Sequence, residues 1–389
     1  MYNIKLMNKI SAAGTEVFSA AKYNVGAEVD APVALMVRSA KLHDMQFDKE
    51  TIAISRAGAG VNNIPCDRCA EEGIVVFNTP GANANAVKEL TLAALLLASR
   101  DIVGGIAWAE ALEANDEVGA KVEAGKGAFA GCELFGKTLG VIGLGAIGGL
   151  VANAGVRLGM KVIGYDPHLS VSAAWNLSGS VVKAESYDEI YAKSDYITLH
   201  IPALPTTKGM INAAAIEKMK DGVKLINLAR GELVNASDLK AALESGKVAK
   251  YVTDFPSAET VGIKNIINIP HLGASTEESE ENCAAMAAQE LCDYIEYGNI
   301  KNSVNYPAVS IPAGNAKPGT RVGICHKNIA NVIAGLTSIL SGSGLNIEHM
   351  ANGSKGEYAY TLIETDSAIS PEAVEKMLTI EGVIRTRLI

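Results

Sequence analysis

Residues 137–167 read KTLGVIGLGAIGGLVANAGVRLGMKVIGYDP, and this stretch decides the fold. It opens with an apolar run at 138–142, which is typical of a buried parallel strand. A G-x-G-x-x-G turn follows at 143–148, and apolar residues then recur at helical spacing. A second strand, predicted at 161–165, ends at Asp166. Together these features indicate the βαβ fingerprint of a dinucleotide-binding domain.

Each glycine of the fingerprint has its own physical reason. Gly143 allows the tight turn, Gly145 lets the backbone approach a pyrophosphate, and Gly148 lets the helix pack closely on the strand. The pyrophosphate is expected at the helix start, where unpaired N–H groups and the positive dipole end point. Asp166 can accept hydrogen bonds from both ribose hydroxyls and would repel a 2′-phosphate. The sequence therefore favours NAD over NADP as the cofactor.

The composition is that of an ordinary globular protein. The chain has 389 residues, 48% of them apolar and 20% charged, and its net charge of −9 argues against broad nucleic-acid binding. The N-terminus lacks a signal-peptide core, and the longest apolar run, 90–98, is too short to cross a bilayer. Cys66 and Cys69 could suggest a redox pair or half a zinc site, but no second C-x-x-C exists. We expect reduced thiols, no metal, no membrane and a cytoplasmic location.

Strands and helices alternate along most of the chain. Residues 1–98 predict a small α/β unit with strands at 4–6, 33–37, 52–55 and 74–77. Beyond the fingerprint, further strands are predicted at 180–182, 196–200, 223–227, 251–253 and 266–269. This rhythm indicates a doubly wound sheet, and a long helix is expected at 277–297. A proline-containing linker is predicted at 305–318, and residues 319–389 show the βαββαβ order of a ferredoxin-like domain.

Two loops at predicted strand ends carry candidate substrate residues. They are residues 56–62 and 78–85, and ligands of parallel sheets gather at such strand ends. Ordinary turn chemistry would explain both loops as well. Arg56 adds a guanidinium that can grip a phosphate or a carboxylate. Arg38 is a second candidate of this kind, although a plain surface arginine fits the sequence equally well.

Three further side chains at strand ends are candidates for chemistry on a 2-hydroxy or 2-keto acid. Arg230 can hold the carboxylate bidentately and point an N–H at the carbonyl oxygen. His271 can exchange the hydroxyl proton near neutral pH, and a carboxylate such as Glu259 beside it would fix its tautomer. Each residue also has a structural explanation: an arginine paired with an acid, a histidine bonded to a carbonyl, or a solvated glutamate.

Three segments carry a resemblance to a known family. The sequences GLGAIG at 143–148, NLARGELV at 227–234 and PHLGAST at 270–276 resemble the signatures of D-isomer-specific 2-hydroxyacid dehydrogenases. The segments at 37–40, 56–63 and 78–81 are similar to those of family members that act on D-3-phosphoglycerate. The tail resembles an ACT regulatory domain. The chain is similar to the shorter members, since no extra domain separates Pro307 from Gly319.

The resemblance implies a Rossmann NAD-binding domain inserted in a flavodoxin-like substrate domain, with a ferredoxin-like ACT domain after them. The implied domains are 1–98 and 277–304 for the substrate domain, 99–276 for NAD, 305–318 for the linker and 319–389 for ACT. The implied reaction is the NAD-dependent oxidation of D-3-phosphoglycerate to 3-phosphohydroxypyruvate, the first step of L-serine biosynthesis.

The resemblance also implies roles for single residues. The catalytic residues would be Arg230, Glu259 and His271, and the substrate would be bound by Arg38, Arg56, Ala57 and Gly58. Besides the three glycines of the fingerprint, NAD would contact Thr79, Ala146, Ile147, Asp166, Ile201, Leu228, Ala229, Arg230, Asp254, His271, Leu272, Gly273 and Ala274. One segment departs from the family: Asp-Val-Phe-x-x-Glu-Pro is usual, whereas residues 254–260 read DFPSAET and lack the proline after Glu259.

An ACT domain implies an amino-acid effector, here L-serine. His326, Asn328 and Asn346 match the positions that hold serine in regulated relatives, in a site closed by two chains. Asn331 stands where those relatives usually have glycine, so a domain that only assembles the oligomer is the alternative. We expect a homodimer or homotetramer. Two other functions stay open: a dehydrogenase for a non-phosphorylated D-2-hydroxy acid, and an NAD-sensing corepressor.

Overall fold

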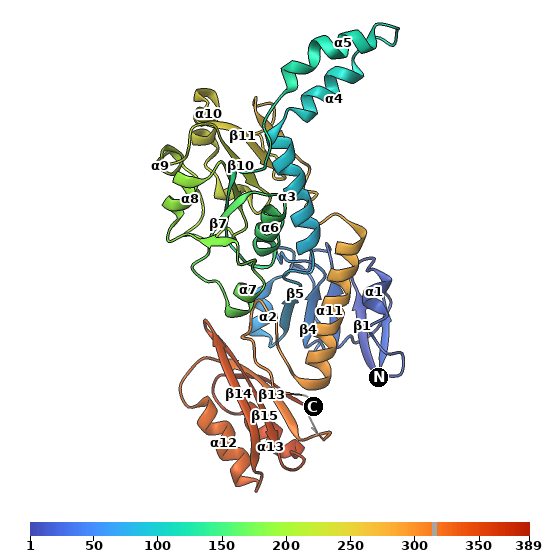
Figure 1. Ribbon diagram of the computed structural model, residues 1–389. Coiled ribbons are helices and arrows are strands. Elements are labelled where there is room, and N and C mark those ends of the chain that lie inside the picture. Colours follow the sequence, from blue (N-terminus) through green and yellow to red (C-terminus); the bar gives the residue numbers. More distant parts are fainter. Residues whose placement is uncertain (313–316) are drawn as a thin grey trace. The chain divides into compact units, whose positions relative to one another are not determined.

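The computed structural model describes residues 1–312 and 317–389, which divide into two compact units. One unit is Met1–Asn83 with Glu277–Ile389, and the other is Ala84–Thr276 (Figure 1). Each unit holds one parallel sheet, and the first also holds an antiparallel sheet. The predicted fold class is therefore confirmed. Residues 313–316 of the predicted linker lie outside the described residues.

The unit Ala84–Thr276 is built on a seven-stranded parallel sheet of order β12-β11-β10-β9-β6-β7-β8, the Rossmann order with one added strand. Its strands are β6 (Thr138–Ile142), β7 (Lys161–Tyr165), β8 (Val181–Lys183), β9 (Tyr196–Leu199), β10 (Val223–Asn227), β11 (Val248–Thr253) and β12 (Ile266–Asn268). Its helices are α3 (Ala84–Ser99), α6 (Ala146–Arg157), α7 (Val171–Trp175), α8 (Tyr187–Lys193), α9 (Ala213–Glu217), η2 (Gly231–Leu233) and α10 (Ala236–Ser245). Helices α3 and α6 pack on one face, and α8, α9 and α10 pack on the other. Burial on both faces explains the continuous apolar runs of the central strands.

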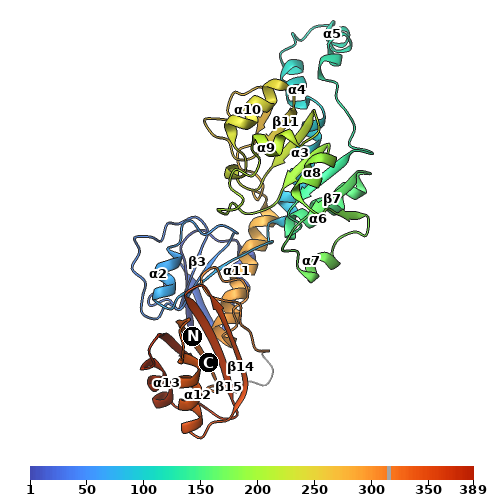
Figure 2. The ribbon, with the colours of Figure 1, turned by 90° about the vertical axis from the view of Figure 1, so that its left-hand side faces the viewer.

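A helical hairpin extends from this unit. It consists of α4 (Ile102–Glu110), α5 (Val118–Gly125) and the short η1 (Lys126–Phe129), none of which contains a buried residue. Both ribbon views show the hairpin projecting away from the sheet (Figures 1 and 2). Among the described residues, no single helix is long and apolar enough to cross a bilayer; α3 and α4 pass that test only as a pair bent by 73°.

The other unit begins with a five-stranded parallel sheet of the flavodoxin-like order β2-β1-β3-β4-β5. Its elements are β1 (Tyr2–Leu6), α1 (Ala12–Thr15), β2 (Tyr23–Gly26), β3 (Ala34–Val37), β4 (Ala53–Arg56), α2 (Cys66–Glu71), β5 (Val75–Asn78) and the returning helix α11 (Glu277–Tyr297). Gly14 of α1 lies against Ala284 of α11, where a Cβ would come within 2.8 Å. This close approach explains the glycine and lets α1 and α11 share a core with the sheet.

The tail forms the predicted βαββαβ unit, an antiparallel sheet of order β14-β15-β13-β16. Its elements are β13 (Arg321–Lys327), α12 (Val332–Gly342), β14 (Ile347–Lys355), β15 (Tyr358–Thr365), α13 (Pro371–Leu378) and β16 (Val383–Leu388). The apolar sides of α12 and α13 pack together with β13 and β15 in one core. The ferredoxin-like order predicted from the alternation of elements is thus confirmed.

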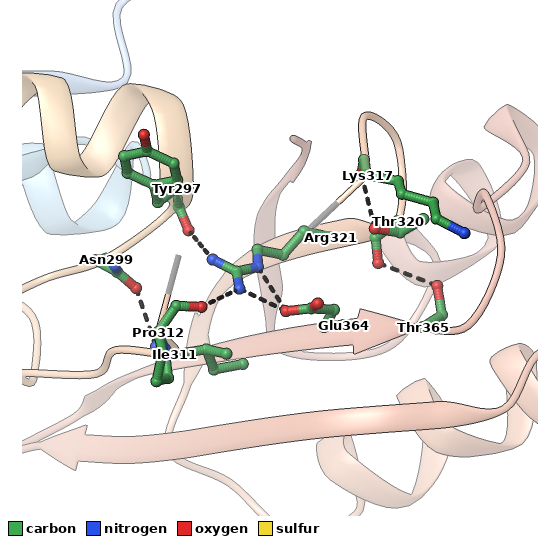
Figure 3. Close-up of polar contacts among 9 residues, drawn as sticks. All are labelled: Tyr297, Asn299, Ile311, Pro312, Lys317, Thr320, Arg321, Glu364 and Thr365. Carbon is green, nitrogen blue, oxygen red and sulfur yellow. Dashed lines mark hydrogen bonds and ion pairs between the residues drawn. The ribbon is translucent and has the colours of Figure 1, made fainter. Parts of the chain in front are cut away.

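A buried arginine ties this tail to the preceding chain (Figure 3). Arg321 of β13 is 1% exposed, and its Nε and Nη2 donate to one carboxylate oxygen of Glu364 on β15. Its Nη1 donates to the carbonyl oxygen of Tyr297 at 3.2 Å, and Nη2 donates to that of Pro312 at 2.7 Å. One guanidinium therefore joins the sheet, the end of α11 and the following segment.

Candidate active site

The predicted cofactor residues of the unit Ala84–Thr276 gather at one edge of its sheet. Because all seven strands are parallel, their carboxyl ends meet there. The residues concerned follow β6 (Gly143, Gly145, Ala146, Ile147, Gly148), β7 (Asp166), β9 (Ile201), β10 (Leu228, Ala229, Arg230), β11 (Asp254) and β12 (His271, Leu272, Gly273, Ala274). The strand order reverses between β6 and β9, which is where ligands of doubly wound sheets bind.

The turn between β6 and α6 leaves room for a pyrophosphate. Gly143 has a φ of +88°, and a Cβ there would come within 2.5 Å of the His200 carbonyl oxygen. A Cβ on Gly148 would lie 1.9 Å from the Gly143 carbonyl oxygen. A Cβ on Gly145 would meet nothing within 4 Å, and α6 begins at the next residue. The backbone therefore forms an open cradle at a helix start, which fits an anionic group.

Asp166 lies beside this cradle. Its Oδ2 accepts a hydrogen bond from the backbone N–H of Leu144 at 2.9 Å, and its Oδ1 accepts one from His168 N–H at 2.8 Å. Leu144 belongs to the glycine turn, so the carboxylate is fixed next to it. Each carboxylate oxygen keeps a further lone pair, which a ribose hydroxyl can use.

Asp254 offers a buried acceptor without a donor. The residue is 1% exposed, its Oδ2 accepts from Gly273 N–H at 3.3 Å, and its Oδ1 has no hydrogen-bond partner among the described residues. Burial raises the pKa of Asp254, while the charges of His271 and Arg230 oppose that rise. Buried polar atoms normally have partners. The orphaned oxygen therefore fits a ligand amide such as the carboxamide of nicotinamide, and with the cradle it makes the site suitable for NAD.

The side chain of Asn227 shapes the turn that carries Arg230. Its Oδ1 accepts from the backbone N–H groups of Ala229 and Arg230 at 3.2 and 3.3 Å, and its Nδ2 donates to the Arg230 carbonyl oxygen at 2.8 Å. The Arg230 side chain is exposed, with Nη1 bonded to the carbonyl oxygen of Ala229. Sequence reasoning did not identify this role of Asn227, because only the folded turn brings its side chain back onto the backbone.

His271 is held in an unusual backbone conformation. Its φ is +45°, and its N–H donates to the carbonyl oxygens of Asp254 at 3.1 Å and of Ile269 at 2.9 Å. Its exposed imidazole packs against the ring of Phe255, with ring centres 4.7 Å apart. Positive φ is rare for residues with a Cβ and is concentrated at functional sites.

The structure does not join Glu259 to His271. In the part of the chain that the structure describes, no hydrogen bond or ion pair links the two residues, and Glu259 is exposed. The physical reason lies in the altered segment, where Ser257 N–H donates to Thr260 Oγ1 at 2.9 Å and Glu259 N–H donates to Ser257 Oγ at 3.3 Å. This local turn keeps Glu259 at the surface, and Asp254 is the acid whose charge interacts with His271.

His200 is a further residue near the cradle that sequence reasoning missed. Its Nε2 lies 2.9 Å from Thr198 Oγ1, and burial lowers its pKa to about 4. Its carbonyl oxygen packs against Gly143, as does the side chain of Ile201. The imidazole is thus neutral at pH 7. The strand predicted at 196–200 ends at this histidine, but the sequence does not show that its side chain is buried.

Arg38 and Arg56 line one cavity in the other unit. Its volume is about 440 Å³, and its lining residues are Arg38, Ser39, Lys41, His43, Arg56, Asn62 and Asn63. Arg56 Nε donates to the Arg38 carbonyl oxygen at 3.1 Å. Gly58 has a φ of +149°, and a Cβ there would come within 2.5 Å of Arg56 Nη1, so the glycine makes room for the guanidinium. Lys41 and His43 are cationic or titratable residues that the sequence did not single out.

Neighbouring residues fix the backbone of this cavity. Asn8 Oδ1 accepts from the N–H groups of Arg38, Ser39 and Ala40 at 3.1, 3.1 and 2.9 Å. Ala57 N–H donates to the Val37 carbonyl oxygen at 2.8 Å, and Thr79 N–H donates to that of Gly58 at 3.2 Å. The hydroxyl of Thr79 is buried and has no partner among the described residues, which suits a ligand contact.

The predicted effector residues lie at two ends of the antiparallel sheet. Asn328 N–H donates to the carbonyl oxygen of Glu357, before β15, whereas Asn346 exchanges hydrogen bonds with Asp366, after β15. One chain therefore does not bring them together. His326 is buried, with its ring nitrogens 2.9 Å from Thr361 Oγ1 and 2.8 Å from the Lys327 carbonyl oxygen. Asn331 has a φ of +68°, a conformation that asparagine adopts more readily than most residues.

Comparison with known proteins gives one family. Residues 92–273 match the family described as "D-isomer specific 2-hydroxyacid dehydrogenase, NAD binding domain". The chain is 32% identical over 354 residues to D-3-phosphoglycerate dehydrogenase of Escherichia coli strain K12, covering 88% of this chain and 82% of that protein. It is 36% identical over 286 residues to the Bacillus subtilis enzyme of the same name, covering 71% of this chain. The chain spans only 52% of that longer relative, about half its length.

Solved structures of other dehydrogenases have a fold similar to that of this chain. An NAD⁺-bound 3-phosphoglycerate dehydrogenase of Entamoeba histolytica matches with a TM-score of 0.60 and 25% identity, over 78% of this chain and 98% of that chain. The Rhodotorula graminis D-mandelate dehydrogenase matches with a TM-score of 0.64 at 22% identity, over 78% of this chain and 97% of that chain, which shows the shared fold.

Proposed function

Because the chain belongs to the D-isomer-specific 2-hydroxyacid dehydrogenase family, we propose that it oxidises D-3-phosphoglycerate to 3-phosphohydroxypyruvate, at the entry to L-serine synthesis. The observation that supports this substrate is the cavity lined by Arg38, Lys41, His43 and Arg56. Three of these side chains carry a guanidinium or an ammonium group, in a chain whose net charge is −9. Such local positive charge is what a dianionic phosphate requires.

We propose the following roles for this chain's residues. The cradle at Gly143–Gly148, with Asp166 and Asp254, holds NAD, which when bound accepts the hydride from C2 of the substrate. Arg230 holds the substrate carboxylate, His271 accepts the hydroxyl proton, and Ala57 and Gly58 line the carboxylate end. Glu259 remains the predicted partner of His271, and the turn that keeps it exposed would have to shift for that contact to form.

Two alternatives make different predictions. A dehydrogenase of non-phosphorylated acids has no phosphate to bind, so it would not require the cluster of cationic side chains around Arg38 and Arg56. A corepressor is expected to end in a disordered tail, whereas residues 319–389 fold into a compact sheet with two helices. An absorbance scan at 340 nm, with NADH and several 2-keto acids, separates these functions. Lack of turnover of 3-phosphohydroxypyruvate would reject the proposed substrate.

Replacing Arg56 by alanine should raise KM for D-3-phosphoglycerate by about 10- to 100-fold, the range expected for charge-assisted hydrogen bonds. KM for D-glycerate, which lacks the phosphate, should change far less. The two KM values are measured in the same assay, and the ratio of the two changes is the result. Equal losses on both substrates would place Arg56 away from the phosphate.

We propose that the tail is an ACT domain and that the chain forms a homodimer or a homotetramer. The hairpin α4–α5 exposes the apolar side chains of Ile102, Val103 and Ile106, which suits burial against a second copy. A monomeric mass in light scattering would contradict the dimer or tetramer.

We also propose a cytoplasmic location. The cysteines are all free thiols, which supports this location. Recovery of the tagged chain outside the cytoplasmic fraction would contradict it.

L-serine is the proposed effector, bound between two chains. We expect Asn328 and Asn346 to contact the serine. Both ring nitrogens of His326 already have partners within the chain, so His326 is the less suitable contact. Serine can act only by binding the active and inactive states differently. A calorimetric titration combined with an assay over the same range tests this. No binding up to millimolar serine would leave the tail as an assembly domain.

A further inference from the structure

An acidic side chain is bound to one arginine of the cationic cavity. Glu280, in the first turn of α11, pairs with Arg38 bidentately: Arg38 Nη1 donates to Oε2 at 3.0 Å, and Nη2 donates to Oε1. The two side chains are 47% and 43% exposed. No carboxylate is among the residues that line the cavity itself, so Glu280 approaches Arg38 from the adjoining helix.

We propose that Glu280 is an internal competitor for Arg38 and thereby sets the affinity of the site for phosphate. This inference rests on the proposed function, because it takes the cavity to be the site of the substrate's phosphate. A guanidinium fork binds a carboxylate and a phosphate with the same two parallel hydrogen bonds. Glu280 therefore occupies the groups of Arg38 that an incoming phosphate needs.

The exchange is feasible because the pair is half-exposed. Ion pairs of this exposure are weak, since water screens the charges and both side chains lose freedom. A dianionic phosphate also attracts Lys41 and Arg56, whose side chains line the same cavity. The phosphate can therefore displace Glu280, but it binds less tightly than it would if Arg38 had no ion pair with Glu280. A substrate without the phosphate makes no such exchange, so Glu280 limits the selectivity for phosphorylated substrates.

Glu280→Gln tests this role because it removes the charge and keeps the shape. Calorimetric titration with inorganic phosphate should show Kd lower by about twofold to fivefold, the range of exposed ion pairs. KM for D-3-phosphoglycerate should fall by a similar factor, while KM for D-glycerate stays unchanged. The gain in phosphate affinity should shrink as salt is added.

Glu278→Gln is the matched control. Glu278 lies in the same first turn, is exposed, and its loss changes the net charge equally, but it makes no ion pair with Arg38. This variant should leave the phosphate Kd unchanged. A Kd for phosphate that rises or stays constant in Glu280→Gln, or that falls equally in both variants, would overturn the proposal. Tighter phosphate binding without turnover of D-3-phosphoglycerate would uphold the role of Glu280 and reject the proposed substrate.

Discussion

Replacing His271 by asparagine should lower kcat by about 10²- to 10⁴-fold, the usual share of general acid–base catalysis. Oxidation of a 2-hydroxy acid releases the hydroxyl proton, and asparagine cannot take it up at neutral pH. The backbone of His271 is held by Asp254 and Ile269, and its imidazole is exposed at the edge where the cofactor residues gather. Asparagine also tolerates the φ of +45°, so the loop should survive the change.

Both directions of the reaction should lose turnover in this variant. Oxidation needs a proton acceptor at this position, and reduction needs a proton donor there. Turnover in each direction is measured at 340 nm, and NAD binding, followed by the quenching of protein fluorescence, should change little in the variant. Near-normal turnover by His271→Asn would remove this residue from the mechanism.

Glu259→Gln distinguishes two arrangements of the site. A loss comparable to that of His271→Asn would support the pair predicted from the family pattern. Turnover near that of the unmodified protein would support the geometry found here, in which Glu259 is exposed and the charge of Asp254 interacts with His271. Asp254→Asn is a less suitable variant, because Asp254 also fixes Gly273 and is a candidate cofactor contact.

The elements predicted best from sequence are those with a strong local signal. The long helix was predicted at 277–297, which are the bounds found for α11, Glu277–Tyr297. The strand Tyr23–Gly26 was missed because it is a short edge strand in which only Tyr23 is buried. Edge strands lack the apolar run that identifies a central strand of a parallel sheet.

The candidate site was predictable where a residue type and a strand end coincide. Arg38 and Arg56 could be placed at neighbouring strand ends from sequence, and they line one cavity. The partner of Arg38 could not be foreseen, because Glu280 comes from a helix more than 200 residues away in the chain. The same holds for Glu259, whose exposure depends on hydrogen bonds within the turn at 257–260. Side-chain partners of this kind depend on packing, which spacing does not encode.

Replacing Arg321 by methionine should destabilise the antiparallel sheet by about 3–5 kcal/mol, the cost of removing one partner of a buried ion pair. Arg321 is 1% exposed, and both N–H groups that face Glu364 share one carboxylate oxygen (Figure 3). Methionine fills much of the volume, but it leaves a buried carboxylate without its cation. The carbonyl oxygens of Tyr297 and Pro312 lose a charged donor as well.

Hydrogen exchange of the β13 and β15 amides is the suitable measurement, because a chain of two compact units need not unfold in one transition. The double variant Arg321→Met with Glu364→Leu should recover part of the loss, since no charge is then buried alone. Arg387→Met is the matched control: Arg387 donates to the carbonyl oxygens of Tyr294 and Ile295 and has no carboxylate partner within residues 1–312 and 317–389. Arg387→Met should therefore lose less stability than Arg321→Met. Equal losses in Arg321→Met and Arg387→Met, with no recovery in the double variant, would show that the unpaired carboxylate is not the main cost.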